Sequence, residues 1–161
     1  MLTTESRVRV DGLSGREVTD FLLNPADDSY RAWWPGTHLA FHLVARGPGE
    51  GHVGDVVLMD EYVGARRVRM TAEVVEEAPG ERVVWRLRLG RVPLPIRVRL
   101  TLESDGHGVL LRHTIAAGWA GPGRFLDPIW RIYLSDSFAA DMDEHAHTEF
   151  RRLRDLLHPA R

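Results

Sequence analysis

The chain has 161 residues, of which 43% are hydrophobic and 27% charged, and its formal net charge is −2. This length fits a single domain over residues 1–161, and the nearly balanced charge argues against nucleic acid or an anionic membrane as an obligatory partner. The absence of cysteine excludes disulfides, thiolate catalysis and zinc–thiolate sites. All 21 basic residues are arginine, which also excludes Schiff-base chemistry on a lysine and a P-loop lysine.

The beginning of the sequence, Met1 to Glu5, has no basic segment followed by an apolar run, so we expect no signal peptide. No run of about 18 apolar residues is present, and we therefore expect no membrane span. Together these features predict a cytoplasmic protein.

The first elements are one short strand and two short helices. Residues 6–10 alternate in polarity and predict a strand. Ser14 with Glu17 three residues later is a capping-box pattern, which predicts a helix that ends at the Asn-Pro pair of residues 24–25. A further helical turn or two is expected over Asp27–Trp33.

Strands dominate the middle of the chain. Apolar and polar residues alternate over residues 39–43, 53–63, 68–74, 83–89, 96–102 and 109–115, and a strong hairpin turn lies at 105–108. The inward face should carry Val68, Met70, Trp85, Leu87, Val98, Leu100 and Leu111. The outward face should carry Arg69, Arg86, Arg88, Arg97, Arg99 and Arg112. Glutamates and threonines interleave with these arginines, which favours a solvated face with cross-strand ion pairs over a basic binding patch.

The last third predicts one long amphipathic helix over residues 127–157, roughly 45 Å long. Its apolar side consists of Leu134, Phe138, Met142, Ala146, Phe150, Leu153 and Leu156. His145 and Glu149 interrupt that side one turn apart. Short connections between the strands favour an antiparallel meander with one solvent-exposed face. The long helix is the only predicted element large enough to cover the other face of the sheet.

Three segments and the element order carry a family resemblance: Arg-Ala-Trp-Trp-Pro at 31–35, Val-Gly-Asp at 53–55, and the helical segment 145–153. The chain resembles the START-like (SRPBCC, Bet v 1-type) superfamily, in particular its polyketide cyclase/dehydrase and lipid-transport branch. This resemblance implies an α+β helix-grip fold, in which a curved seven-stranded antiparallel sheet wraps around a long C-terminal helix, with two short helices after the first strand. It also implies a hydrophobic cavity that binds small apolar or amphipathic molecules, and catalysis in only some members.

The candidate catalytic residues are His113, His145 and Glu149. A histidine and a carboxylate at i and i+4 can act as an acid/base pair or orient the polar end of a ligand. Alternatively, Glu149 pairs with an arginine of the sheet and His145 with a backbone carbonyl. His113 falls on the apolar face of its strand, facing the helix, either as a ligand contact or as a satisfied core residue.

Aromatic and apolar residues are the candidate ligand contacts, with ordinary core and rim packing as the alternative. They are Trp85, Trp130, Tyr133, Leu134, Phe138 and Met142. A metal site is not expected, because His145 and His147 point to opposite sides of a helix and no His-Glu-x-x-His pattern is present.

The sequence therefore predicts a protein that binds a small hydrophobic or aromatic molecule in an internal cavity between sheet and C-terminal helix, as a carrier or sensor. The alternative is a cofactor-free enzyme resembling polyketide cyclases or dehydratases, with the cavity histidines and glutamate as acid/base groups. Neither a cofactor nor a nucleic-acid partner is expected. The oligomeric state is left open, with a homodimer as one option.

Overall fold

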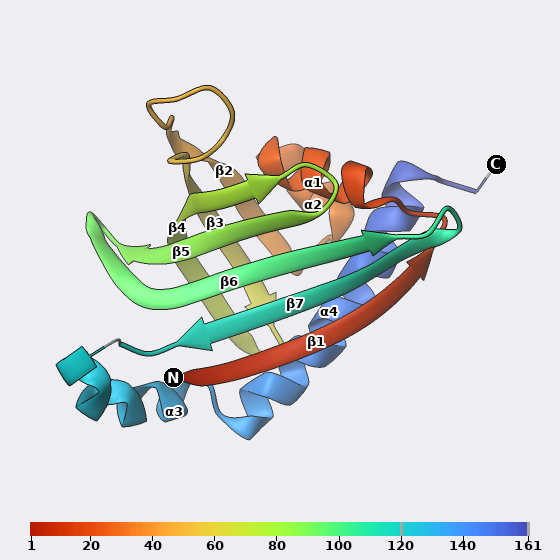
Figure 1. Ribbon diagram of the computed structural model, residues 1–161. Helices are drawn as coiled ribbons and strands as arrows, with labels where there is room; N and C mark the ends of the chain where they lie inside the picture. Colours follow the sequence, from red (N-terminus) through yellow and green to blue (C-terminus); the bar gives the residue numbers. More distant parts are fainter. Residues whose placement is uncertain (120, 161) are drawn as a thin grey trace.

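The computed structural model describes residues 1–119 and 121–160, and its strands form one seven-stranded antiparallel sheet (Figure 1). The sheet order is β1-β7-β6-β5-β4-β3-β2, which makes β1 and β2 the two edge strands. The strands are β1 (Leu2–Asp11), β2 (His38–Ala45), β3 (Val56–Val63), β4 (Arg66–Ala78), β5 (Arg82–Leu89), β6 (Val92–Ser104) and β7 (Gly108–Ala117). The helical segments are α1 (Gly15–Leu23), α2 (Asp27–Trp33), η1 (Gly121–Ile129), α3 (Trp130–Tyr133) and α4 (Asp136–Leu157). This architecture confirms the predicted helix-grip fold.

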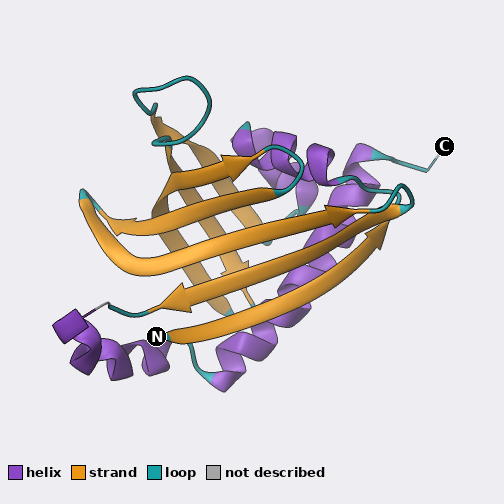
Figure 2. Ribbon diagram, viewed as in Figure 1, coloured by secondary structure: helices purple, strands orange, loops and turns teal. Residues whose placement is uncertain are grey.

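The sheet curves around α4, which crosses one of its faces diagonally (Figure 1). Among the strands, α4 packs most extensively against the edge strand β1. Figure 2 shows α1 and α2 together near the C-terminal end of α4, while η1 and α3 lie at the opposite end of the sheet. The concave face of the sheet is therefore covered along its length by α4 and at its two ends by short helices.

The register of the strands agrees with the predicted alternation. Trp85 of β5 pairs with Val74 of β4 and with Val98 of β6, and Trp85 is buried. Arg97, the next residue along β6, is exposed. On the outer face, Arg86 and Arg88 approach the Glu73 carboxylate across the strands at 3.6 and 3.2 Å. These pairs support the interpretation of the arginine face as a solvated surface with cross-strand ion pairs.

The two short helices after β1 form as the sequence predicts. Ser14 caps α1, since its Oγ accepts a hydrogen bond from the backbone N–H of Glu17 while the Glu17 carboxylate accepts one from the N–H of Ser14. Such a capping box satisfies backbone donors that the first turn leaves free. From α2, the indole N–H of Trp33 donates to the backbone carbonyl of Glu149 at 2.6 Å. Helix α2 is thus fixed to the C-terminal half of α4.

The prediction of one continuous helix over residues 127–157 is wrong in its first third. That part forms the 3₁₀ segment η1 and the single turn α3, and α4 begins only at Asp136. Pro128 lacks a backbone N–H, and Leu134 leaves the helical conformation with φ −99° and ψ 55°. Ser135 then caps a new helix, its Oγ accepting from the N–H of Phe138 at 3.3 Å. Helix α4 has 22 residues, which corresponds to roughly 33 Å.

The apolar core has a large part and a small part. The large part lies under α1, α2 and the C-terminal half of α4, where Phe150 and Leu153 are buried. The small part contains Val63, Ile115 and Met142, nearer the N-terminal end of α4. Within residues 1–119 and 121–160, no helix combines the length and the apolar character that crossing a membrane requires.

Candidate functional site

A cavity of about 680 Å³ lies between the sheet and α4. Strands β3 to β7 form one wall and α4 the opposite wall, and the lining is mostly apolar. At the inner end of the cavity, Trp33 of α2 and Leu22 of α1 contribute to the lining. At the other end the cavity reaches the surface, because Ile129 and Tyr133 also line it and are 46% and 58% exposed. We call this second end the rim.

All nine residues predicted as site residues line this cavity. They are His113, His145, Glu149, Trp85, Trp130, Tyr133, Leu134, Phe138 and Met142. Strand β5 supplies Trp85 and β7 supplies His113, while the other seven come from α3, α4 and the junction between them. The structure therefore brings the predicted residues together, whereas their roles in catalysis or binding stay predictions.

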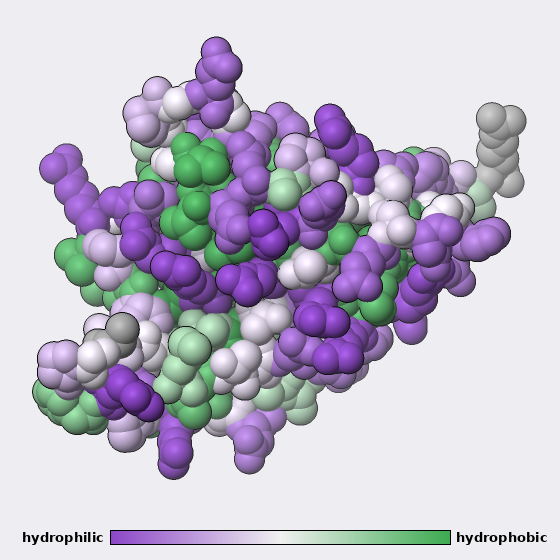
Figure 3. Space-filling model, in the orientation of Figure 1, coloured by the Kyte–Doolittle hydropathy of each residue, from purple (hydrophilic) through white to green (hydrophobic). Residues whose placement is uncertain are grey.

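The rim is aromatic. The ring of Trp130 lies between those of Trp119 and Tyr133, with centroid distances of 5.2 and 6.0 Å. None of residues 121–133 is buried, and Phe125 and Ile132 are 75% and 73% exposed. In Figure 3 this region lies at the lower left, where green apolar side chains are exposed among white and purple ones. Flat apolar side chains around an opening can contact a planar apolar molecule as it enters.

The inner end contains a group of polar residues that we call the polar cluster: His38, Glu61, His145 and Glu149. Nε2 of His145 lies 3.5 Å from the Glu61 carboxylate and 3.9 Å from that of Glu149. Nε2 of His38 lies 3.6 Å from each of the same two carboxylates. Glu61, His145 and Glu149 face the cavity, while His38 lies behind them, fully buried.

Two aromatic residues of α2 hold the polar cluster in place. The Tyr30 hydroxyl donates to the Glu61 carboxylate at 2.6 Å, and the Tyr30 ring stacks on the His38 imidazole with centroids 4.0 Å apart and planes at 5°. Trp33 donates to the backbone of Glu149. The short helix α2 therefore positions three members of the cluster, although it contributes none of them.

Burial dominates the electrostatics of the polar cluster. It raises the pKa of Glu149 to about 8, and the charge of Glu61 adds to the effect although His145 opposes it. Burial also lowers the pKa of His38 to about 4. For His145, burial lowers the pKa, but the contact with Glu61 and the charge of Glu149 outweigh it and the net direction is upward. Glu149 thus retains its proton at neutral pH more readily than an ordinary carboxyl.

His113 lies on the sheet wall of the same cavity. Burial lowers its pKa to about 4, so its imidazole is neutral at pH 7. His113 is only partly buried, but the accessible part of its side chain lines the cavity. Burial can therefore still lower its pKa strongly. A neutral imidazole can donate one hydrogen bond and accept another.

Sequence reasoning missed His38 and Glu61. A signal for Glu61 was present, because it shares the inward phase of β3 with Val57, Met59 and Val63, where a carboxylate stands out. No comparable signal existed for His38. A β-bulge between His38 and Ala40 breaks the alternation, so that His38 and Phe41 are both buried although they are three residues apart.

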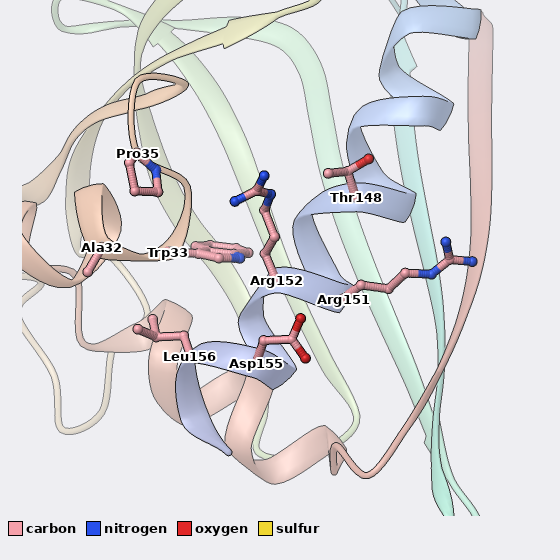
Figure 4. A pocket seen from close by; sticks show the side chains of 8 residues that line it. All are labelled: Ala32, Trp33, Pro35, Thr148, Arg151, Arg152, Asp155 and Leu156. Carbon is pink, nitrogen blue, oxygen red and sulfur yellow. The ribbon is translucent and has the colours of Figure 1, made fainter. Parts of the chain in front are cut away.

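A second hollow lies on the outer surface of the molecule, between α2 and α4 (Figure 4). Figure 4 shows Trp33 of α2 facing Arg152 of α4 across this open surface hollow, with Asp155 and Leu156 below. Trp33 lines both spaces, so its indole separates the cavity from the outside at this point.

The arrangement permits several kinds of chemistry. Two imidazoles and two carboxylates at the inner end of an apolar cavity can hydrogen-bond the polar end of a ligand. Groups of this kind can also transfer a proton or ligate a cation.

Comparison with known proteins gives a fold and not a close relative. No protein-family profile and no curated protein matches the chain. Among solved structures, Ara h 8.0201 matches with a TM-score of 0.61 at 12% identity, covering 97% of both chains. The protein TTHA0849 from Thermus thermophilus matches with a TM-score of 0.61 at 13% identity, again covering 97% of both chains. The major latex-like protein 151 of Panax ginseng matches with a TM-score of 0.53 at 18% identity, covering 90% of this chain and 98% of its own.

These identities are too low to carry an activity from one protein to another, but the matches extend over nearly the whole of each chain. They therefore support the fold given by the order of elements and the sheet around α4. The chain has a helix-grip fold, the fold that its resemblance to the START-like (SRPBCC, Bet v 1-type) superfamily implies.

Proposed function

We propose that the protein binds one small hydrophobic or aromatic molecule in the cavity and acts as its carrier or sensor in the cytoplasm. The observation that carries this proposal is the cavity of about 680 Å³ with its mostly apolar lining. Pockets for small molecules typically measure roughly 300–1,000 Å³ and combine apolar walls with a few placed polar groups. The polar cluster is such a set of groups.

The two ends of the cavity suggest how the ligand lies. Its polar end would face Glu61, His145 and Glu149, because leaving a hydroxyl or carbonyl among apolar walls costs a hydrogen bond. Its apolar body would contact Trp85 and Phe138 on opposite walls. Entry at the rim is favoured, since a segment without buried side chains opens at a low cost in free energy.

A matched pair of substitutions on β6 tests this proposal. Val98 lines the cavity, whereas its neighbour Arg97 lies on the outer face and is exposed. Val98→Trp would project a bulky indole into the cavity and obstruct it, and Arg97→Trp adds the same side chain outside it. We expect V98W to abolish binding of an apolar fluorescent probe and R97W to leave it unchanged. Equal binding by both variants would show that the probe does not occupy the cavity.

Native mass spectrometry of the purified protein identifies the ligand class directly. We expect a co-purified small molecule in wild-type protein and in R97W, and its loss from V98W. A wild-type protein that carries no molecule and binds no apolar probe would contradict the proposal.

A cyclase- or dehydratase-like enzyme is the second candidate, favoured by the convergence of His113, His145 and Glu149 on one cavity. The double variant His113→Gln, His145→Gln separates the two. A carrier keeps most of its affinity for the co-purified molecule in this variant, because glutamine still donates and accepts hydrogen bonds although it does not transfer protons. An enzyme loses conversion of that molecule, followed by mass spectrometry over time, while the V98W variant loses both binding and conversion.

A further inference from the structure

We propose that the polar cluster binds one divalent transition-metal ion at the inner end of the cavity. The four side chains come from β2, β3 and α4, and each offers one ligand atom within 4.8 Å of the other three. This inference goes beyond the proposed ligand binding and departs from the expectation of no metal, which considered only spacing along the sequence. His38 and Glu61 were absent from that reasoning.

The distances within the polar cluster suit a small ion. Zinc binds imidazole nitrogen and carboxylate oxygen at about 2.0–2.2 Å, which puts neighbouring ligand atoms of a tetrahedron roughly 3.3 Å apart. The four histidine-to-glutamate distances in the cluster are 3.5, 3.6, 3.6 and 3.9 Å. A contraction of a few tenths of an ångström at these four contacts, and of up to about 1.5 Å for the most distant pair of ligand atoms, therefore converts this arrangement into a coordination shell.

The hydrogen bonding of the cluster is incomplete. Among the described residues, neither ring nitrogen of His38 and not Nε2 of His145 has a hydrogen-bond partner. The two side chains are 0% and 4% exposed, so bulk water does not satisfy them. Buried polar atoms are rarely left without a partner, and those that are call for an explanation such as a bound ion. Both Nε2 atoms face the same two carboxylates.

Charge gives an independent argument. Glu61 and Glu149 together carry two negative charges when ionised, in a place where isolated charges are costly to bury. One divalent cation between them balances both and allows each carboxylate to ionise. Arg152 of α4 carries a positive charge near the cluster, but its guanidinium packs over the Trp34 ring at 5.3 Å from the centroid.

Residues around the polar cluster orient its side chains, as residues outside the ligands of a metal site commonly do. The hydrogen bond from Tyr30 orients the Glu61 carboxylate, and the stacked Tyr30 ring fixes the plane of the His38 imidazole. Trp33 holds the α4 backbone at Glu149. Groups of this kind, outside the ligands themselves, commonly determine metal affinity.

The donor set indicates the class of ion. Two imidazoles favour zinc or iron-group ions over magnesium and calcium, which prefer oxygen ligands only, and the absence of sulfur disfavours copper(I). Because Glu61, His145 and Glu149 line the cavity, an oxygen of a bound molecule could complete the shell.

The test is a titration of chelator-treated protein with Co²⁺, read by visible absorption and then by displacement with Zn²⁺. We expect one Co²⁺ per chain with visible ligand-field bands, and displacement by Zn²⁺. Glu149→Gln and Tyr30→Phe should each weaken binding by about tenfold or more. His147→Gln is the matched control, since His147 is a half-exposed residue of the same helix whose Nδ1 faces the Asp143 backbone carbonyl and carboxylate, and this variant should bind the metal as wild type does.

Thermal melting establishes that each variant is folded, and X-ray absorption of the wild-type cobalt complex needs no variant. That spectrum should show nitrogen and oxygen ligands with two imidazoles. Any of four results would overturn the proposal. They are no cobalt ligand-field bands, fewer than two imidazole ligands in the X-ray absorption spectrum, a Co²⁺ affinity in E149Q equal to that of wild type, or a weaker Co²⁺ affinity in H147Q. The V98W variant distinguishes the two proposals, because a blocked cavity should lose the apolar probe and keep the metal.

Discussion

The two ends of the cavity are built in different ways. The inner end combines side chains from β2, β3 and α4, fixed by hydrogen bonds and stacking from α2. The rim is one continuous stretch of chain, residues 121–133, without a buried side chain. Asp127 helps to fix this stretch, accepting hydrogen bonds from the backbone N–H of Trp119 and the amino group of Met1 at 2.9 and 2.7 Å.

This difference separates two tasks. A polar site needs groups held to within a fraction of an ångström, and packing between distant elements provides that rigidity. Access to a cavity needs a segment that moves at a low cost in free energy, and a segment with few buried contacts provides it. Substitutions at the inner end should therefore affect the stability of the protein more than substitutions at the rim.

The largest effect is expected from Trp33→Ala at the inner end. The side chain is 2% exposed, donates to the Glu149 backbone and separates the cavity from the outer hollow. Its removal should lower the free energy of unfolding by about 3–5 kcal/mol. Chemical denaturation measures this, with Trp33→Phe as a partial replacement that keeps an aromatic ring but loses the hydrogen bond. A loss below about 1 kcal/mol in W33A would mean that α2 does not hold the inner end together.

Tyr30→Phe should have the next largest effect. It removes one hydroxyl whose hydrogen bond to the buried Glu61 carboxylate measures 2.6 Å, and it keeps the stacking on His38. A hydrogen bond to a charged group contributes about 1.5–3 kcal/mol, and we expect the metal-free protein to lose that much stability. The exposed Tyr133→Phe at the rim is the matched control, with a change within about 0.5 kcal/mol. Equal losses in both would contradict the contrast between the ends.

The pH dependence of stability isolates Glu149. Its pKa is raised from 4.5 to about 8 on folding, so the folded protein keeps a proton that the unfolded chain releases between these values. This contribution to stability is complete below pH 4.5 and is lost as the pH rises toward 8. The slope is at most about 1.4 kcal/mol per pH unit. Denaturation of metal-free wild type and E149Q over this range measures it, since only the wild type has this contribution; identical pH profiles would refute the raised pKa.

The smallest effect is expected from Ile132→Ser at the rim. Ile132 is 73% exposed, so the free energy of unfolding should stay within about 0.5 kcal/mol of wild type. The rate at which an apolar probe enters the cavity should change, which stopped-flow fluorescence measures. The contribution of the inner end to the stability of the protein should not change. A large loss of stability would place Ile132 in a packed interface and contradict the description of the rim as loosely held.

The sequence predicted those parts of the fold that obey a local rule. Strand alternation placed Trp85, Val98 and His113 on the inner face, and the Ser14–Glu17 pair predicted the start of α1. The His145 and Glu149 pair was found because both lie on one face of one helix.

The missed features depend on irregularities or on packing. The bulge beside His38 reverses the alternation at one residue, and nothing in a period-two pattern reveals it. The end of α3 at Leu134 and the cap at Ser135 interrupt a helical pattern that remains apolar across the break. The polar cluster joins three elements that only the tertiary structure brings together.

The sheet order has a consequence for how the protein reaches its fold. Strand β1 is an edge strand that pairs with β7, in a register that joins residues 2–11 to residues 108–117. During synthesis, β1 cannot complete its pairing until residue 117 has been made. Closing so long a loop carries a large entropic cost, and such non-local contacts slow folding. Until β7 emerges from the ribosome, the exposed backbone of β1 therefore depends on its charged side chains, among them Arg7, Arg9 and Asp11, to avoid pairing with another chain.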